Sequence, residues 1–346
     1  MRKFALIAPV LVAVFLSVGA APAQACGGLI GPNGAVNLVR TTTLAGYADG
    51  VEHYVTAFQF AGGSGEFGSI IPLPGVPTTV ERGGDWTLQR LVRETAPPVR
   101  FAAAEGAAVT AGAPAPAEVI LQTKVDALDI TVLKGGGEAV GDWARDHGFL
   151  LPPDAPEVLD FYARRSPIFL AARFDADAAR QRGQRIGDGT PVHITIPTEN
   201  PWVPLRILAL GKQPSEQIQA DVYLLTPTRP ALLPNPSLGR SGLLLERSEP
   251  ASPSLVTDLQ ADQGMGWMPN DMWLTYLKVD AKAGQLGYDL ATDVSGRATP
   301  STRAAGLTEA PVPLSDGMLF TPLVLAVALG IAAVIGVVAV RLARVP

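Results

Sequence analysis

Long apolar runs occur at the two ends of the chain and nowhere between them. Residues 1–25 begin with two basic residues, continue with an apolar stretch over 4–19 and end in Ala23-Gln24-Ala25. A positive start, an apolar stretch and a small-x-small site are the three parts of a secretory signal peptide. We therefore predict export, with cleavage just before Cys26. An uncleaved N-terminal anchor and a lipidated Cys26 are the alternatives.

The second apolar run covers residues 318–340, contains no charged side chain and is followed by Arg341 and Arg344. About 20 apolar residues cross a bilayer as a helix, so this run is long enough to span one with some tilt. Positive residues beside a span favour the cytoplasmic side. The pattern predicts a single-pass type I protein of the cell membrane. Its bulk is extracytoplasmic, and residues 341–346 form a cytoplasmic tail.

Between the two ends the pattern is mostly that of short strands, separated by Gly and Pro. Val192, Ile194 and Ile196 alternate with two polar residues, which predicts a strand with one buried face. A turn at 48–50 is expected to join two strands into a hairpin. The predicted strands cover residues 35–44, 51–60, 66–73, 119–133, 168–174, 192–196, 205–210, 218–225, 243–245 and 272–279.

Three segments show helical spacing instead. Asp85 is placed to cap a helix whose apolar face begins at Leu88. A second helix is expected over 140–147 and is stopped by Gly148, because glycine is favoured just after a helix. A third helix begins at Asp154.

The predicted fold class is α+β and mostly β. It consists of antiparallel sheet with several short helices and Pro-rich loops, plus the C-terminal transmembrane helix. Residues 26–226 and the Pro-rich loop and further β region at 227–296 are expected to share one domain. Residues 297–317 are polar and Pro-rich, which predicts a stalk before the span. Residues 101–117 predict an exposed loop.

The net charge of the exported part argues against two kinds of partner, nucleic acid and anionic lipid. Four of the 27 basic residues lie in the end segments, so the exported part carries 23 against 32 acidic residues, a net charge of −9. Nucleic-acid-binding proteins carry basic patches, so this balance argues against a nucleic-acid partner. It also argues against adhesion to anionic lipid through a polybasic surface.

The chain contains one cysteine, Cys26. A lone cysteine closes no disulfide within the chain, and zinc sites built on cysteine pairs are excluded. An unpaired cysteine in an exported protein indicates a partner in another chain, lipidation or a free thiol. Stability must therefore come from the hydrophobic core.

Histidine and serine offer the first candidates for chemistry. His53, His147 and His193 are neither in an HExxH motif nor within four residues of one another, so we interpret them as structural. Ser64 and Ser69 follow glycines but lack the GxSxG pattern of a nucleophile elbow. The sequence therefore assigns no catalytic residue, no metal site and no cofactor.

Paired carboxylates are a further candidate. Asp175 with Asp177, or Asp126 with Asp129, could transfer protons or hold a cation. Each pair lies near the end of a predicted element, where carboxylates commonly cap a helix or face solvent. We interpret both pairs in that way.

The most unusual segment is 262–273, DQGMGWMPNDMW. Such a loop could present an aromatic and thioether surface to a ligand or partner. The alternative, which we favour, is that these side chains close one end of the sheet core. The residues concerned are Met265, Trp267, Met268, Met272 and Trp273.

Five motifs stand in a characteristic order: ACGG at 25–28, FGSIIPLPG at 67–75, ALDITVLKGG at 127–136, DWARDHGFLLP at 142–152 and PWVPLRILAL at 201–210. In this order the chain resembles the DUF2330 family of exported, uncharacterised bacterial proteins, over roughly residues 25–226. The resemblance implies export and often a C-terminal membrane helix, but no established activity. A second cysteine commonly follows ACGG in that family, whereas Leu29 and Ile30 stand here.

These observations together predict a membrane-anchored extracytoplasmic protein that serves as a binding or structural domain at the bacterial cell envelope. Its expected partners are the membrane and an envelope protein or ligand. One alternative is a hydrolase-like envelope enzyme without a recognisable motif. Another is a thiol or lipid-anchored function through Cys26.

Overall fold

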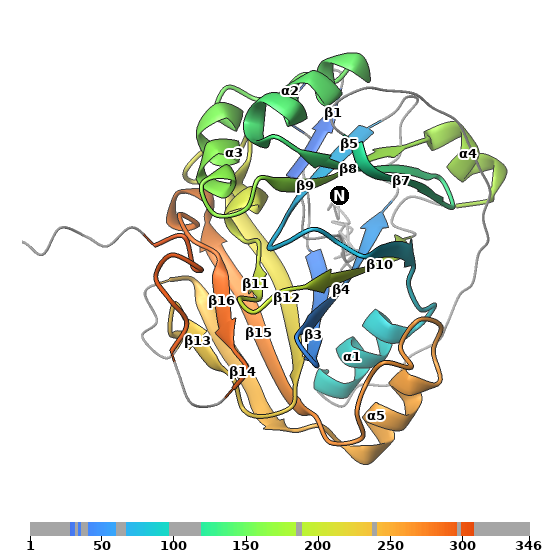
Figure 1. Cartoon of the computed structure of the whole chain (residues 1–346), viewed down its shortest axis with the longest axis vertical. Coiled ribbons are helices and arrows are strands. Elements are labelled where there is room, and N and C mark those ends of the chain that lie inside the picture. The colour runs from blue at the N-terminus through green and yellow to red at the C-terminus, as the bar shows by residue number, and fades with distance from the viewer. Residues whose placement is uncertain are drawn as a thin grey trace, which may run out of the picture. The chain divides into compact units, whose positions relative to one another are not determined.

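A β-hairpin forms the centre of the largest sheet. In the hairpin, β3 (Thr41–Ala48) and β4 (Val51–Gln59) are joined at Asp49 and Gly50, both with positive φ, as the sequence predicts. Figure 1 shows the arrangement. The computed structural model describes residues 28–31, 34–35, 41–59, 67–96, 119–184, 189–236, 241–295 and 299–307. Through Gly306 they belong to one compact unit.

The hairpin belongs to a seven-stranded sheet with the order β14-β15-β12-β3-β4-β10-β6. Residues from the region 227–296 supply β14 and β15, so this region shares its sheet with the earlier strands. The pair β3–β12 is parallel, and the other pairs are antiparallel. The remaining strands are β6 (Thr79–Arg82), β10 (Gly189–Pro197), β12 (Gln217–Thr226), β14 (Leu243–Pro250) and β15 (Trp273–Lys282).

A second sheet has six antiparallel strands in the order β2-β1-β5-β9-β8-β7. A third, small sheet has the order β11-β16-β13. The second sheet contains β1 (Gly28–Gly31), β2 (Gly34–Ala35), β5 (Phe67–Leu73), β7 (Val119–Val125), β8 (Leu128–Lys134) and β9 (Ile168–Phe174). The third contains β11 (Trp202–Val203), β13 (Ala231–Leu233) and β16 (Leu290–Asp293).

The described ranges contain five α-helices and two short 3-10 helices. The mostly β class is confirmed, whereas the expectation of purely antiparallel sheet is wrong at β3–β12. None of the helices described is both long and apolar enough to cross a bilayer, and the predicted span at 318–340 lies outside the described residues. The helices are α1 (Thr87–Thr95), α2 (Gly136–Asp146), α3 (Ala155–Ala163), α4 (Ala176–Gln181), α5 (Pro253–Gln260), η1 (Arg206–Ala209) and η3 (Ala283–Gln285).

The seven-stranded sheet has both faces covered near its centre. Helices α1 and α5 pack against each other and cover one face together with the segment 262–272 (Figure 1). Because of this cover, His193 on β10 is buried as fully as Val192, Ile194 and Ile196 on the opposite face. The expected alternation is confirmed along most of the strand, since Pro191 and Thr195 are only half-buried, and it fails at His193.

Two predicted strands are also wrong. The stretch 119–133 is folded into the hairpin β7–β8, whose turn holds Asp126 at φ 55, a conformation that Asp adopts more readily than most residues. The stretch 205–210 contains the 3-10 helix η1, because the backbone N–H groups of Leu205 and Arg206 donate to a buried carboxylate, Asp289, rather than to a neighbouring strand. The strand at 168–174 is confirmed without change as β9.

The predicted helices α1, α2 and α3 are confirmed, but the predicted cap of α1 is wrong. The Asp85 side chain caps nothing; instead the Asp262 carboxylate accepts hydrogen bonds from the backbone N–H groups of Asp85 and Trp86, at 3.0 Å each. Asp154 stands at the start of α3, and its carboxylate accepts from the Gly211 N–H rather than from its own helix.

Residues 299–306, which the sequence assigns to a stalk, lie against the domain. Ala305 is fully buried, and its carbonyl accepts a hydrogen bond from the Asp289 N–H at 2.9 Å. The Arg165 guanidinium donates to the Ala304 carbonyl at 2.7 Å. This segment, which we call the C-terminal strap, ties the end of the folded unit to Arg165, just after α3, and to Asp289, just before β16.

Candidate functional site

Strand β4 carries two adjacent ionisable residues, Glu52 and His53. Successive side chains of a strand point to opposite faces, so the two residues face different layers of the fold. Glu52 faces the small sheet that contains β11 and β16, and His53 faces the layer of α1 and α5. Both are buried, with 1% and 9% of their surface exposed. Each lies at the centre of a candidate site.

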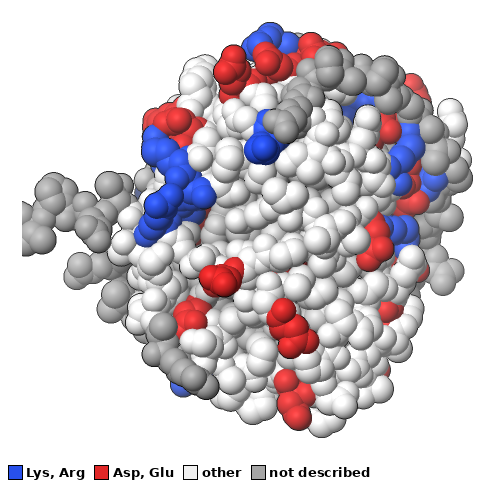
Figure 2. All heavy atoms as spheres, in the orientation of Figure 1, with Lys and Arg blue, Asp and Glu red and all other residues white. Residues whose placement is uncertain are grey.

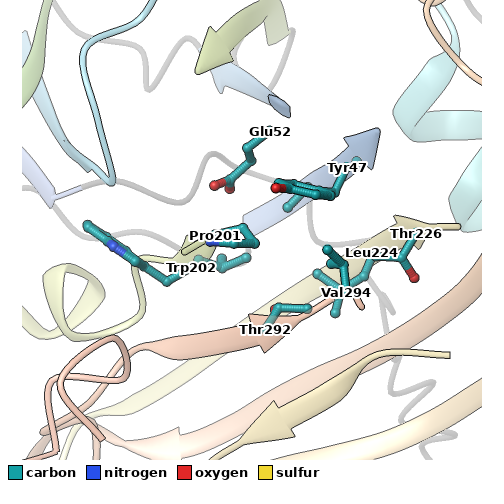
Figure 3. Close-up of a pocket in the computed structure, with 11 residues that line it drawn as sticks. Tyr47, Glu52, Pro201, Trp202, Leu224, Thr226, Thr292 and Val294 are labelled. Atoms are coloured by element: carbon teal, nitrogen blue, oxygen red, sulfur yellow. The ribbon is translucent and has the colours of Figure 1, made fainter. Parts of the chain in front are cut away.

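Glu52 borders a small cavity, shown in Figure 3. The cavity has a volume of about 10 Å³, room for about one water molecule. Neither carboxyl oxygen of Glu52 has a well-formed hydrogen-bond partner among the described residues. In Figure 3 the Tyr47 hydroxyl is directed toward Glu52, whereas the Glu52 carboxyl is directed away from Tyr47. The lining residues are Ala45, Gly46, Tyr47, Glu52, Pro201, Trp202, Val203, Leu224, Thr226, Thr292 and Val294.

Burial controls the ionisation of this site. Burial raises the pKa of Glu52 from 4.5 to about 8, while the backbone N–H of Trp202 acts in the opposite direction. The pKa of Tyr47 is also raised, by burial first and then by the charges of Glu52 and Glu199. At neutral pH Glu52 is therefore a carboxylic acid, which both donates and accepts hydrogen bonds.

The second site is a pair of histidines. Nδ1 of His53 and Nε2 of His193 share a hydrogen bond of 3.0 Å. Glu81 lies opposite His193 in the β6–β10 pairing, with Oε1 3.4 Å from Nδ1 of His193. The Trp267 ring stacks on His53, with the ring centres 3.9 Å apart and the planes 2° from parallel.

Burial lowers the pKa of both histidines. The pKa of His53 falls to about 4, with a further contribution from the neighbouring His193. The pKa of His193 also falls because of burial, and the Glu81 carboxylate opposes this change. The pair is therefore neutral at neutral pH. The order Glu81, His193, His53 can orient the imidazoles, because a carboxylate fixes the tautomer of the histidine beside it.

The family of the chain is shown by a match along most of its length, and neither the Glu52 cavity nor the histidine pair is needed to recognise it. The model of the family described as "Uncharacterized protein conserved in bacteria (DUF2330)" matches residues 20–232, more than half of the chain. The chain belongs to the DUF2330 family. The resemblance inferred from the five motifs over residues 25–226 is confirmed. A comparison with curated proteins found no match to this DUF2330 chain.

Solved structures give a distant likeness. A mutated baculovirus P35 after caspase cleavage is similar over 73% of the DUF2330 chain and 99% of its own, with 7% identity and a TM-score of 0.40. P35 in its complex with caspase-8 is similar over 73% and 90%, with 9% identity and a TM-score of 0.33. Likeness at this level supports no statement about what the DUF2330 chain does.

The candidate histidines divide into two groups. His53 and His193, 140 residues apart in the sequence, meet across β4 and β10, although the sequence interpretation treated them as separate. His147 ends α2, where its Nδ1 lies 2.8 Å from the Trp143 carbonyl oxygen. The described part of this DUF2330 chain holds no cluster of three or more His, Cys, Asp or Glu placed to share a metal ion.

The paired carboxylates have structural partners. The Asp175 carboxylate accepts from the Ala178 N–H at 2.8 Å and so caps α4, and Asp177 pairs with Arg180. Asp126 pairs with Arg82 and Arg182, and Asp129 with Lys124 and Arg173. On the face shown in Figure 2, basic residues lie mostly beside acidic ones. The interpretation as a helix cap or a solvent-facing carboxylate is confirmed for Asp175 and Asp177, but it is wrong for Asp126 and Asp129, which are mostly buried in ion pairs.

The segment 262–273 mainly fills the core. Met265, Met268 and Met272 are buried in the cluster that α1 and α5 form over the sheet, so the core interpretation is confirmed for them. Trp267 is partly buried over Gly46 and His53, and the Trp273 indole N–H donates to Ser248. Ser69 is buried in β5. Ser64 and Cys26 lie outside the described residues.

Sequence reasoning missed Glu52 altogether. In the run VEHYVTAFQ it reads as one polar residue of a strand, and its partner layer comes from residues more than 140 positions later. A hydrophobic pattern shows which face of a strand is buried only when one face is polar throughout. Both faces of β4 mix polar and apolar residues, so the pattern held no signal for this carboxyl.

Proposed function

We propose that this DUF2330 chain is a membrane-anchored extracytoplasmic domain that binds a ligand or partner at the cell envelope. The signal-peptide pattern of residues 1–25 and the apolar run at 318–340 support the anchoring. The isolated Glu52 carboxyl beside its cavity is the observation that supports binding.

The C-terminal strap supports a tethered arrangement. The backbone carbonyls of Ala304 and Ala305 accept hydrogen bonds from Arg165, just after α3, and from Asp289, just before β16. A chain that continues from Gly306 toward an anchor would therefore transmit force to the core of the domain and not to a loose end. Residues 307–317 remain the predicted stalk.

Accessibility labelling in intact cells tests the topology. In a Cys26→Ser background, Leu150→Cys, at a position 59% exposed, should react with a membrane-impermeant maleimide. Arg344→Cys should react only after lysis. Deletion of 318–340 should release the protein from the membrane fraction. Protection of Leu150→Cys in intact cells would contradict the proposal.

A second candidate function, acid–base catalysis at the envelope, is favoured by one observation. The series Glu81, His193 and His53 places a carboxylate behind a pair of imidazoles, an arrangement that can move a proton. Against this, no hydroxyl among the described residues is hydrogen-bonded to either histidine of the pair. Hydrolysis of a panel of ester and amide substrates that His53→Phe abolishes would favour the enzyme over the binding domain.

A further inference from the structure

The histidine pair has two ring nitrogens that converge on one point. Nδ1 of His53 and Nε2 of His193 are 3.0 Å apart, and the two side chains come from the neighbouring strands β4 and β10. Both rings are buried, and burial lowers the pKa of each, so the pair is neutral at neutral pH. Neutral imidazole is the state that binds metal ions, and histidine is the commonest metal ligand in proteins. The pair therefore presents the chemistry of a small metal site.

A carboxylate lies behind the pair. Oε1 of Glu81 is 3.4 Å from Nδ1 of His193. A ligating histidine almost always directs its other ring N–H to a carboxylate, a carbonyl or water, which fixes the tautomer and makes the ligating nitrogen more basic. Glu81 therefore favours a proton on Nδ1 of His193 and leaves a lone pair on Nε2, facing His53. It also supplies one negative charge beside the pair.

The number of ligands selects the kind of ion. The described residues hold no group of three or more His, Cys, Asp or Glu placed to share a metal ion. Zinc takes about four ligands and calcium about six or more, so neither suits the pair. Monovalent copper forms linear complexes with a facing pair of nitrogen ligands, and imidazole is a suitable ligand for copper. The pair supplies the whole ligand set that such an ion needs.

We propose that His53 and His193 bind one Cu(I) ion between Nδ1 of His53 and Nε2 of His193. As the ion enters, the proton on Nδ1 of His53 moves to Nε2 of the same ring. Both imidazoles remain neutral, and the single positive charge of the ion faces the Glu81 carboxylate. Copper arrives and stays as Cu(I), so no electron is transferred.

The two rings must part to admit the ion. Zinc, which has the same filled d shell as Cu(I), binds imidazole at about 2 Å, so the two nitrogens would move from 3.0 Å to about 4 Å apart. Trp267, which stacks on His53, can give this room, because its indole N–H has no hydrogen-bond partner among the described residues. The space beside the preceding residue is open, since a side-chain atom added at Gly266 would meet nothing within 4 Å. The Trp267 ring also supplies an aromatic face, which attracts cations.

Competition for Cu(I) tests the proposal in the full chain in detergent. Cys26→Ser serves as the parent protein, because thiolates also select Cu(I). Ascorbate keeps the copper reduced, and bicinchoninate, a chelator that is coloured when it holds Cu(I), reports the copper lost to the protein. The parent should withdraw one equivalent. Glu81→Gln should lower the affinity about 10–100-fold, as outer-shell changes typically do, and His193→Gln should lower it further. His147→Gln, the matched control at the histidine that ends α2, should bind as the parent does.

A parent protein that withdraws no copper from the chelator would overturn the proposal, and so would equal affinities in the parent and His193→Gln. Should His193→Gln fail to fold, X-ray absorption at the copper edge of the loaded parent decides the question. Nitrogen neighbours alone support the site. Sulfur neighbours would place the copper on methionine and overturn it. None of these results depends on membrane anchoring, so the proposal can fail without the proposed function.

Discussion

Glu52 and His53 are consecutive residues of β4, and both are buried, on opposite faces of the same sheet. Burial keeps both neutral, but it does so by opposite changes in pKa. The pKa of the acid rises to about 8, and that of the imidazole falls to about 4. The two residues therefore make the stability of the domain depend on pH in opposite directions.

Glu52→Gln should remove a loss of stability that develops as the pH rises toward 8. The folded state holds the Glu52 proton up to about pH 8, whereas the unfolded state releases it near 4.5. Between these values the unfolded state gains an advantage of about 1.4 kcal/mol per pH unit, on the order of 4 kcal/mol in total. Urea unfolding of the native protein should show this decline between about pH 6.5 and pH 8, because at lower pH the opposite contribution of His53 offsets it.

In Glu52→Gln the same decline should be largely absent, whatever the absolute stability of the variant. Glu138→Gln serves as the matched control, because Glu138 is exposed at the start of α2, and it should keep the native slope. A native protein whose stability is level between pH 6.5 and pH 8 would show that Glu52 is ionised in the fold.

His53→Phe should allow the domain to stay folded at lower pH than the native protein. The pKa of His53 is lowered from 6.5 to about 4, so its contribution is present above pH 6.5 and is lost as the pH falls toward 4. Phenylalanine keeps an aromatic ring against Trp267 and has no proton to gain. The midpoint of acid unfolding, followed by tryptophan fluorescence, should move to lower pH. Coincident acid curves for the two proteins would contradict this assignment.

The sequence was sufficient to predict the elements that local chemistry determines. Asp49 and Gly50 allow a tight turn, so the β3–β4 hairpin was predictable, and Gly148 marks the end of α2. Both ends of β9 agree with the strand predicted from its apolar run. In each case the deciding interaction lies within a few positions along the chain.

Features made by distant segments could not be predicted in this way. His193 is buried because α1, α5 and the segment 262–272 cover its face, and none of these is near it in sequence. The turn at Asp126 divides a run that has the composition of one long strand. The Glu52 cavity depends on β11 and β16. A pattern in one strand carries no information about the layer that covers it.

Asp262→Ala should destabilise α1, although Asp262 is far from that helix in sequence. Its carboxylate accepts from the N–H groups of Asp85 and Trp86 and from the Thr87 hydroxyl. Loss of a helix cap typically destabilises a protein by about 1–2 kcal/mol. Urea unfolding should show this loss, whereas Asp85→Ala, which removes one exposed ion pair with Arg82, should change stability by less than about 0.5 kcal/mol. A larger loss of stability in Asp85→Ala than in Asp262→Ala would instead identify Asp85 as the cap of α1.

Asp289→Asn should release the C-terminal strap. Asp289 is fully buried, and its carboxylate pairs with Arg165, which also holds the Ala304 carbonyl. Removal of one partner from a buried ion pair typically destabilises a protein by about 3–5 kcal/mol, because the other charge remains buried. Brief trypsin digestion with mass spectrometry should then detect early cleavage after Arg303. Asp160→Asn, which breaks an exposed ion pair on the same helix α3, should leave Arg303 as protected as in the native protein. Equal cleavage rates at Arg303 in all three proteins would show that the strap does not depend on Asp289.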